Sequence, residues 1–193
     1  MKVHLVRDRA VQCLITMEKE HVFSSQLLNR YEKDFEESRD RSLLREYTYG
    51  VLENRTYLDY VIDTVSSKKS SKLRIPLKNI LRLAVYELVI LKTPAHAAIN
   101  EAVKLVKKYD FHASGFANGV LRSIDRNGLD IEIMTEDKLT KLSIRYSHPK
   151  WMIEYLRKYF AGKELEILLK KNNMPSPISI FVNPKKISVT EAM

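Results

Sequence analysis

Hydrophobic residues recur at intervals of three and four through most of the chain, which is the spacing of one face of an α-helix. From Val3 to about Lys19 this pattern leaves charged and amide side chains on the opposite side, and it predicts an amphipathic helix. Ser24 is suited to cap a second helix that runs through Tyr31, and Ser38 to cap the next one. The chain is therefore predicted to open with a series of helices.

The two stretches that follow predict the centre of the fold. Residues 40–65 keep the helical spacing throughout, with a bend expected near Gly50 or Asn54. A loop rich in serine and lysine then ends with Pro76, a residue suited to the first turn of a helix. Residues 77–91 are almost all apolar, so we expect this helix to be the most buried of the set.

Two more helices complete the first predicted domain, residues 1–128. One covers residues 95–109, and the other covers residues 116–128 and ends in an Asn-Gly stop. Gly119 lies inside the second of these helices, where glycine costs about 1 kcal/mol relative to alanine. We therefore expect another part of the backbone to approach Gly119 closely.

A connector and a second unit are predicted beyond the first domain. Residues 129–147 form the connector, in which Thr135 is suited to cap a helix. Residues 148–193 form the second unit, with one helix starting at Pro149 and another before the paired asparagines. β-branched residues in a period of two predict a strand at 178–182. The predicted fold class is all-α, a helical bundle and a helical connector followed by the opening strand of a small α+β subdomain.

The last residues, SVTEAM, have the pattern of a helix capping box, with Ser188 as cap and Glu191 reaching back to it. A helix of one turn does not offset the cost of its own nucleation. The pattern therefore predicts that the sequence is part of a longer one, and a disordered tail that imitates a cap is the alternative.

The charge of the chain adds a class of partner to this picture. The sequence has 33 Lys and Arg against 24 Asp and Glu, a formal net charge of +9, which favours polyanions such as nucleic acid. No stretch approaches the roughly 18 apolar residues of a membrane span, and charges interrupt the N-terminus where a signal peptide is apolar. We therefore expect a cytoplasmic protein without a membrane partner.

The residues that usually carry catalysis do not form a recognisable motif here. The sequence has no glycine-rich phosphate loop, no G-x-S-x-G and no H-E-x-x-H. No Cys and His cluster has the spacing of zinc ligands. The single cysteine, Cys13, lies at an apolar position of the first helix and is interpreted as a buried hydrophobic residue. We expect this chain by itself to be no enzyme and to bind neither metal nor cofactor.

Basic residues gather in three places, and they are the candidate RNA-binding residues. They lie on the first helix, in the serine-rich loop and on the last helix of the first domain: Arg7, Arg9, Lys68, Lys69, Lys72, Arg74, Arg122 and Arg126. Lysine and arginine side chains neutralise phosphates and supply affinity rather than sequence choice. The alternative is that these charges only solvate the surface.

Several stretches together resemble known families. The bundle resembles the NusB family of RNA-binding proteins in REYTYGVLENRTYLDYVID, LRLAVYELVILKTPAHAAINEAV and FANGVLRSI. The second unit is similar to the linker region of ribosomal RNA cytosine-5 methyltransferases of the RsmB (Sun or Fmu) type in LSIRYSHPKWMIEYLRKYF and NNMPSPISIFVN.

The resemblance implies a function for the whole chain. In such enzymes a NusB-like domain and a small RRM-like part precede a Rossmann-type domain that binds S-adenosylmethionine and supplies the attacking cysteine. Cys13 matches neither of the cysteines of the family's motifs. The implied role is recognition of small-subunit ribosomal RNA for a catalytic domain that this sequence does not contain.

The resemblance also implies partners and leaves two alternatives. The implied partners are small-subunit ribosomal RNA, the protein's own C-terminal catalytic domain and a ribosomal protein. One alternative is a protein- and RNA-binding module of transcription antitermination. The other is a structural clamp for the missing catalytic domain.

Overall fold

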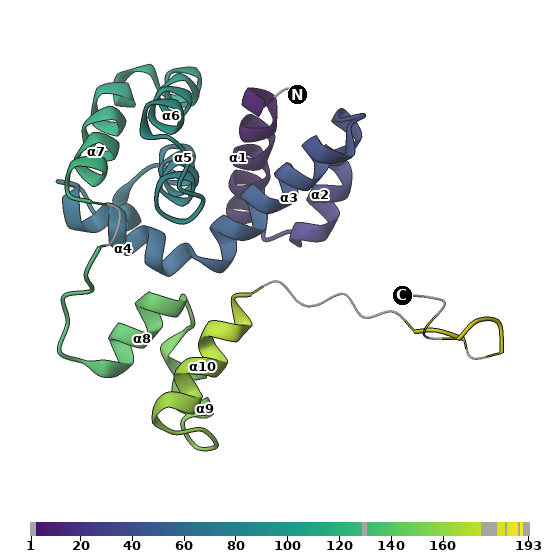
Figure 1. Cartoon of the computed structure of the whole chain (residues 1–193). Coiled ribbons are helices and arrows are strands. Elements are labelled where there is room, and N and C mark those ends of the chain that lie inside the picture. The colour runs from purple at the N-terminus through teal and green to yellow at the C-terminus, as the bar shows by residue number, and fades with distance from the viewer. Residues whose placement is uncertain (1–2, 129–130, 175–180, 184, 189, 191–193) are drawn as a thin grey trace.

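The computed structural model of the chain describes residues 3–128, 131–174, 181–183, 185–188 and 190. Figure 1 shows a larger helical bundle, α1 to α7, and a smaller helical unit, α8 to α10. The α-helices are α1 (Val3–Glu20), α2 (Ser24–Tyr31), α3 (Ser38–Glu53), α4 (Arg55–Val65), α5 (Ile75–Val85), α6 (Ala95–Tyr109), α7 (Ser114–Arg126), α8 (Lys138–Tyr146), α9 (Lys150–Leu156) and α10 (Gly162–Asn172). Within the described ranges no β-strand is present, so the all-α prediction is confirmed.

Four short turns connect or extend these helices. Three are 3-10 turns and one is π-helical, namely η1 (Glu32–Asp34), η2 (Ser70–Lys72), η3 (Tyr86–Ile90, π-helical) and η4 (Phe111–Ala113). The predicted strand at 178–182 falls mostly outside the described residues, and so does Glu191 of the predicted capping box.

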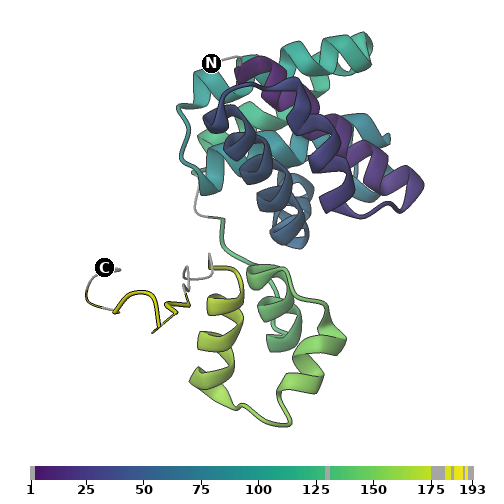
Figure 2. The same ribbon diagram turned by 90° about the vertical axis from the view of Figure 1, so that its right-hand side faces the viewer.

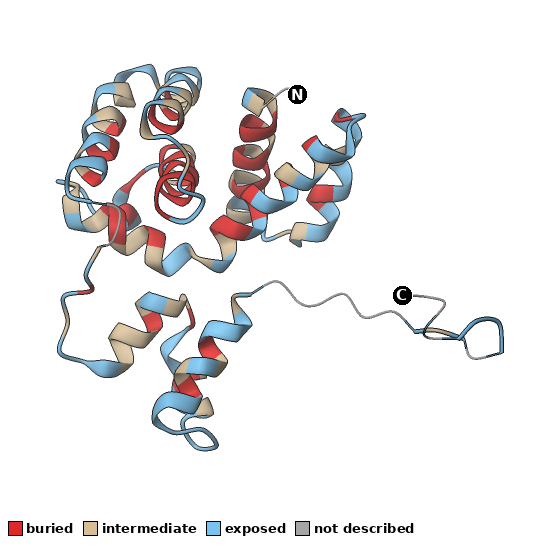
Figure 3. Ribbon diagram, viewed as in Figure 1, coloured by how far each residue is buried: buried red, intermediate tan, exposed pale blue. Residues whose placement is uncertain are grey.

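The helix α5 and the turn η3 lie at the centre of the bundle, as the apolar stretch predicted. Leu83, Tyr86 and Leu88 are all buried there. Figure 3 shows the buried residues of the bundle concentrated on α1 and α5, with exposed residues on the outer helices. Pro76 lies in the first turn of α5, where its missing N–H has no helical partner to lose. The most apolar segment is thus surrounded by the other helices.

The bend predicted near Gly50 or Asn54 is the junction of α3 and α4. Asn54 ends α3 with φ −103° and ψ 10°, outside the helical region. Its side-chain amide donates to the carbonyl of Gly50 at 2.9 Å, and its own carbonyl accepts from the N–H of Leu58 at 2.9 Å. Because Asn54 bonds to both helices, the break occurs there.

The predicted close approach at Gly119 is wrong, and Gly50 is where a glycine is required. A Cβ added to Gly119 would meet no atom within 4 Å. A Cβ at Gly50 would overlap the ring of Tyr86, whose hydroxyl donates to the carboxylate of Glu46. Glycine at position 50 therefore allows η3 to pack against α3.

The smaller unit has its own apolar cluster. Ile153, Leu165 and Leu169 are its buried residues, contributed by α9 and α10. At the start of α8 the cap is Asp137, whose carboxylate accepts the N–H groups of Leu139 and Thr140, and not the predicted Thr135. A short connection leads to this unit from α7, and Figure 2 shows the smaller unit below the bundle.

Polar contacts attach the smaller unit to the bundle through α4. The N–H of Tyr57 donates to the hydroxyl of Ser147 at 3.1 Å, beyond the end of α8. The hydroxyl of Tyr60 accepts the N–H of Met134 at 2.8 Å and donates to the carbonyl of Glu132 at 3.3 Å. The connector is thus held against the exposed side of α4.

Candidate nucleic-acid interface

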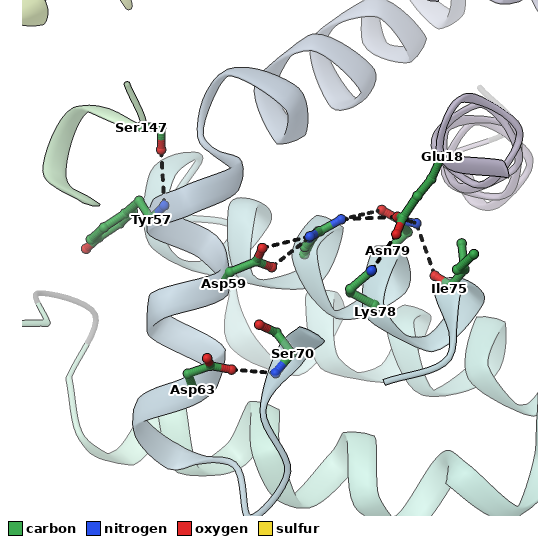
Figure 4. A network of polar contacts seen from close by, with 10 residues as sticks. Glu18, Tyr57, Asp59, Asp63, Ser70, Ile75, Lys78, Asn79 and Ser147 are labelled. Atoms are coloured by element: carbon green, nitrogen blue, oxygen red, sulfur yellow. Dashed lines mark hydrogen bonds and ion pairs between the residues drawn. The ribbon is translucent and has the colours of Figure 1, made fainter. Parts of the chain in front are cut away.

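The loop between α4 and α5 is held in one conformation that points its lysines outward. Asp63 of α4 accepts the N–H of Ser70 at 2.5 Å, and Figure 4 shows this contact at the base of the loop. Ser70 and Leu73 are buried, whereas the cations on either side of them are exposed. Two buried anchors therefore fix the backbone and leave four cations on its outer side: Lys68, Lys69, Lys72 and Arg74.

A second segment faces this loop and makes a hollow with it. The hollow has a volume of about 470 Å³ and is lined by residues of the loop, of η4 and of the start of α7, among them Lys68, Lys72, Arg74, Asp110, His112 and Phe116. Arg74 lies 3.3 Å from the carboxylate of Asp110, but its side chain is 83% exposed. An exposed pair of this kind contributes little and is readily exchanged. The hollow is thus rimmed by cations around one carboxylate. We call the four loop cations, Lys68, Lys69, Lys72 and Arg74, together with this hollow, the basic loop.

The sequence did not point to His112 or Phe116 as part of this site. Both lie in a segment separated from the loop by the whole of α5 and α6. Their signal is weak in sequence, because a histidine in the short turn η4 and an aromatic residue in the first turn of α7 have no characteristic spacing. Only the packing of η4 and α7 against the loop brings them there.

The other basic residues of this region are engaged inside the bundle. Arg82 donates to both carboxylate oxygens of Asp59 at 2.7 Å, and Glu18 accepts from Asn79 at 3.0 Å and pairs with Lys78. Figure 4 shows this network joining α1, α4 and α5 next to the contact between Asp63 and Ser70. The network pairs Lys78 and Arg82 with carboxylates, whereas the loop cations are exposed.

The charge of Glu18 is part of this network. Burial alone would raise the pKa of its carboxyl, but the hydrogen bonds from Lys78 and Asn79 and the charges of Lys78 and Arg82 lower that pKa below its ordinary value. Glu18 is therefore held in its ionised form.

Arg7, a predicted RNA-facing residue, lies inside the protein. Its guanidinium donates to Glu87 at 2.6 and 3.0 Å, and Tyr47 donates to the same carboxylate at 2.7 Å. Burial alone would lower the pKa of Arg7, but the hydrogen bonds and charge of Glu87 raise it. A carboxylate buried in η3 requires a cation beside it, and Arg7 supplies that cation. The prediction of a surface role for Arg7 is corrected to an internal ion pair.

Arg9 also has partners, and it lies on a different side of the bundle from the basic loop. Its guanidinium lies 2.5 Å from the carboxylate of Asp34, donates to Gln12 at 2.7 Å and lies 5.8 Å from the centre of the Tyr31 ring. These partners belong to α1, α2 and η1, which Figure 1 shows far from α7. The predicted single surface of Arg9 and the loop lysines is therefore not formed.

Arg122 and Arg126 remain exposed on α7. They lie four residues apart on one face of the helix, and each donates to a side chain of its own helix, Asn118 at 3.1 Å and Ser123 at 3.2 Å. Among the residues the structure describes, neither is paired with a carboxylate. Both arginines add positive charge to the second half of α7, the helix whose first turn lines the hollow.

A larger hollow of about 710 Å³ lies between α1 and α6, but its charges are compensated. Lys108 pairs with Asp8 at 2.7 Å, and Lys104 pairs with Glu101 at 2.6 Å. Tyr109 also donates to Asp8, and burial together with that carboxylate raises the pKa of Tyr109 to about 12. Two carboxylates, Asp8 and Glu101, line this hollow against one at the basic loop, so the basic loop is the better candidate for an anion.

Other kinds of site find little support in the described ranges. Cys13 is completely buried, as predicted, and burial raises the pKa of its thiol to about 11. No group of three or more His, Cys, Asp or Glu side chains in the described part of the chain is placed to hold a metal ion. None of the described helices is long and apolar enough to cross a membrane.

Comparison with protein families finds two matches, one in each part of the chain. Residues 4–126 match the model of the NusB family. Residues 148–193 match the ferredoxin-like domain of RsmF/B-like methyltransferases. The resemblance predicted from the sequence is therefore confirmed for both parts.

Curated relatives match this chain over part of their own length. A probable ribosomal RNA small subunit methyltransferase B from Bacillus subtilis is 33% identical over 196 residues, which cover 100% of this chain and 44% of that protein. A protein with the same description from Synechocystis is 29% identical over 154 residues, covering 79% of this chain and 34% of the relative. The chain thus spans less than half the length of these relatives.

Solved structures show the same fold. Thermotoga maritima NusB is 26% identical with a TM-score of 0.61, covering 67% of this chain and 94% of that one. A crystal structure of the antitermination factors NusB and NusE in complex with dsRNA gives 25% identity and a TM-score of 0.60, covering 66% of this chain and 100% of that one. The structure of PH0851 covers 97% of this chain and 43% of its own, with a TM-score of 0.68; at 21% identity it shows likeness of fold alone.

Proposed function

The chain belongs to the NusB family, and we propose that it recognises small-subunit ribosomal RNA for an S-adenosylmethionine-dependent cytosine-5 methyltransferase. The observation that carries the proposal is the basic loop, which has four exposed cations beside a hollow. In this role the chain binds RNA and presents it to a catalytic domain located elsewhere in the enzyme. The cytoplasm, where ribosomal RNA is modified, is the proposed location.

Phosphate contact is the chemistry that the basic loop can supply. Lys68, Lys69, Lys72 and Arg74 offer N–H donors and positive charge, and Arg122 and Arg126 continue the surface along α7. Such contacts position an RNA backbone without reading its bases. Support comes from the similar NusB structure that was solved with dsRNA. Binding is expected to weaken steeply with salt, because each neutralised phosphate releases counterions.

The two alternative functions are an antitermination module and a structural clamp for the catalytic domain. An antitermination module is not favoured, because residues 148–193 match a domain of methyltransferases and the curated relatives are ribosomal RNA methyltransferases. A clamp that only braces the catalytic domain would not need the exposed loop lysines to contact RNA. A measurement of RNA binding therefore distinguishes the clamp from the proposed function.

The decisive experiment reverses charges in the basic loop and at a matched control site. Lys68→Glu with Lys72→Glu is compared with Lys19→Glu and Lys33→Glu, which are exposed on α1 and η1 and change the net charge equally. Binding to small-subunit ribosomal RNA fragments is measured at several salt concentrations. The loop variant is expected to bind weakly, with a slope of log K on log salt that is flatter by about 0.7 to 0.9 per lost contact. Equal curves for both variants and the parent would reject the basic loop as the RNA surface.

The chain alone is proposed to neither bind S-adenosylmethionine nor methylate RNA, because the sequence has no glycine-rich strand-to-helix turn for that cofactor. Calorimetry with S-adenosylmethionine tests this directly. Saturable binding would show that a cofactor site exists in these residues.

A further inference from the structure

Three aromatic residues form a row on the smaller unit and are exposed to solvent, although large aromatic side chains are usually buried. Trp151 is 69% exposed, Tyr155 52% and Tyr159 66%. They are spaced four residues apart, so they follow one face of α9 and the turn after it. Ile153 occupies the opposite face and is completely buried. We call these three residues the aromatic row.

The row is held in place by the backbone beyond the end of α9. The N–H groups of Tyr159 and Phe160 both donate to the carbonyl of Leu156, at 3.0 and 2.9 Å, which winds the chain into one further turn. The rings of Tyr155 and Tyr159 consequently meet, with centroids 5.4 Å apart and planes at 57°. Both residues remain more than half exposed.

Cations accompany the row. The ammonium of Lys158 lies 5.8 Å from the centre of the Tyr155 ring. In the described part of the chain neither Lys158 nor its neighbour Arg157 forms an ion pair. Residues 148–174 contain six Lys and Arg against three Glu. An apolar protein surface would not be complemented by this charge, whereas a polyanion would be.

We propose that the aromatic row is a stacking platform for unpaired bases of an RNA, with Lys158 and Arg157 binding the adjoining phosphates. This inference rests on the proposed function, since it requires that the chain bind RNA. It adds a second contact of another kind, because the basic loop has phosphate-binding groups and the row offers ring faces. Stacking on aromatic side chains together with cations is a common way to bind single strands.

The spacing of the row favours a single strand over a duplex. Side chains four residues apart on a helix are separated by about 6 Å along its axis. Stacked bases in a duplex are separated by about 3.4 Å per strand. The Tyr155 and Tyr159 rings are also tilted by 57°, so bases stacked on them would not be parallel as they are in a duplex. The smaller unit is therefore expected to prefer loops, bulges or ends of the RNA.

The sole tryptophan of the chain makes this inference directly measurable. We would titrate the full chain with a short unstructured pyrimidine RNA, a blunt RNA duplex of the same length and heparin, a polyanion without bases. Stacking on Trp151 is expected to quench its fluorescence with the pyrimidine RNA alone. Equal quenching by heparin would overturn the proposal, because charge would then explain the signal.

Variants of the row separate stacking from folding. Trp151→Ala and Tyr159→Ala are each expected to weaken binding of the pyrimidine RNA by about five-fold or more, as loss of one stacked base would. Trp151→Phe keeps a ring face and should restore most of the affinity. The control is Phe23→Ala, since Phe23 is 76% exposed but lies before α2. Thermal unfolding of each variant reports whether the fold is intact.

The outcomes distinguish this proposal from the proposed function. If the alanine variants bind the pyrimidine RNA as the parent does, the aromatic row is not a platform, although the basic loop can still bind RNA. If the chain binds no RNA at all, both proposals fail. If Trp151 fluorescence changes with protein concentration in the absence of RNA, the row is a protein contact and the stacking proposal is overturned.

Discussion

The bundle and the smaller unit differ in where their large apolar and charged side chains lie. In the bundle, α5 and η3 are buried on all sides and charged residues such as Arg7 and Arg82 are paired internally. In the smaller unit the buried cluster consists of Ile153, Leu165 and Leu169, and the aromatic row faces outward. A small unit buries a smaller fraction of its surface than a large one. The comparison shows that exposure here reflects the size of each core as well as function.

The same difference explains why the net charge of the chain does not show where a polyanion binds. The formal charge of +9 includes arginines that stabilise the interior of the bundle. The accessible cations include those of the basic loop, of α7 and of the turn after α9, and others such as Lys19 and Lys33. Which cations meet a polyanion is decided by pairing, because a buried ion pair is unavailable to a phosphate.

Two residues allow the two parts to be followed separately. Cys13 is the sole cysteine and lies in the core of the bundle, so its alkylation reports opening of the bundle. Exchange of backbone amide hydrogens in α8 to α10 reports opening of the smaller unit.

The largest effect is expected from Glu87→Ala in the bundle. The change leaves Arg7 buried without its partner and removes the acceptor of Tyr47, which should cost about 3–5 kcal/mol of unfolding free energy. Denaturant unfolding followed by alkylation of Cys13 measures it. The control Glu101→Ala breaks an exposed pair with Lys104 and should cost at most about 1 kcal/mol. Equal midpoints for the two variants would contradict the internal role of Arg7.

The next effect is expected from Ile153→Ala in the smaller unit. Removing this side chain should cost about 2–3 kcal/mol, at the low end for a core isoleucine because the half-exposed neighbours can close the cavity. Faster amide exchange in α8 to α10 with unchanged alkylation of Cys13 is the expected result. Ile167→Ala is the matched control, because Ile167 is exposed on α10. Faster alkylation of Cys13 in Ile153→Ala would show that the two parts unfold together.

A smaller effect is expected from Gly50→Ala in the bundle. The new methyl group overlaps the ring of Tyr86, and displacing that ring also breaks its bond to Glu46, so the change should cost about 1–3 kcal/mol. Gly119→Ala has open space and should stabilise the bundle by about 0.5–1 kcal/mol. Thermal unfolding of both variants gives opposite shifts if the packing is as described, and a shift of the same sign would refute it.

The smallest effect concerns pH and the network that joins Glu18 to Lys78, Asn79 and Arg82. Since the pKa of Glu18 is lowered in the folded protein, its contribution to stability is present above the unfolded value near 4.5 and is lost as pH falls below it. Glu18→Gln should therefore weaken the protein at neutral pH and show a shallower loss of stability in acid. Glu20→Gln, at an exposed neighbouring position, serves as the control. Identical acid profiles for the parent and Glu18→Gln would exclude this role.

Much of the fold was predictable from sequence because local patterns determine it. Helical spacing located the helices, Pro76 marked the start of α5, and the apolar stretch identified the buried centre. The break at Asn54 was also predictable, since an asparagine side chain competes for backbone hydrogen bonds. The resemblance to known families likewise rests on short, local stretches of the sequence.

The tertiary structure alone decided which of these residues reach the surface and which meet. Arg7 and Lys72 are equally basic in sequence, yet one pairs with Glu87 inside the bundle and the other lines a hollow with His112. Gly50 and Gly119 are both glycines within helices, and only the ring of Tyr86 distinguishes them. The physical reason is that pairing and close packing join residues far apart in the chain, and helical periodicity carries no information about such partners.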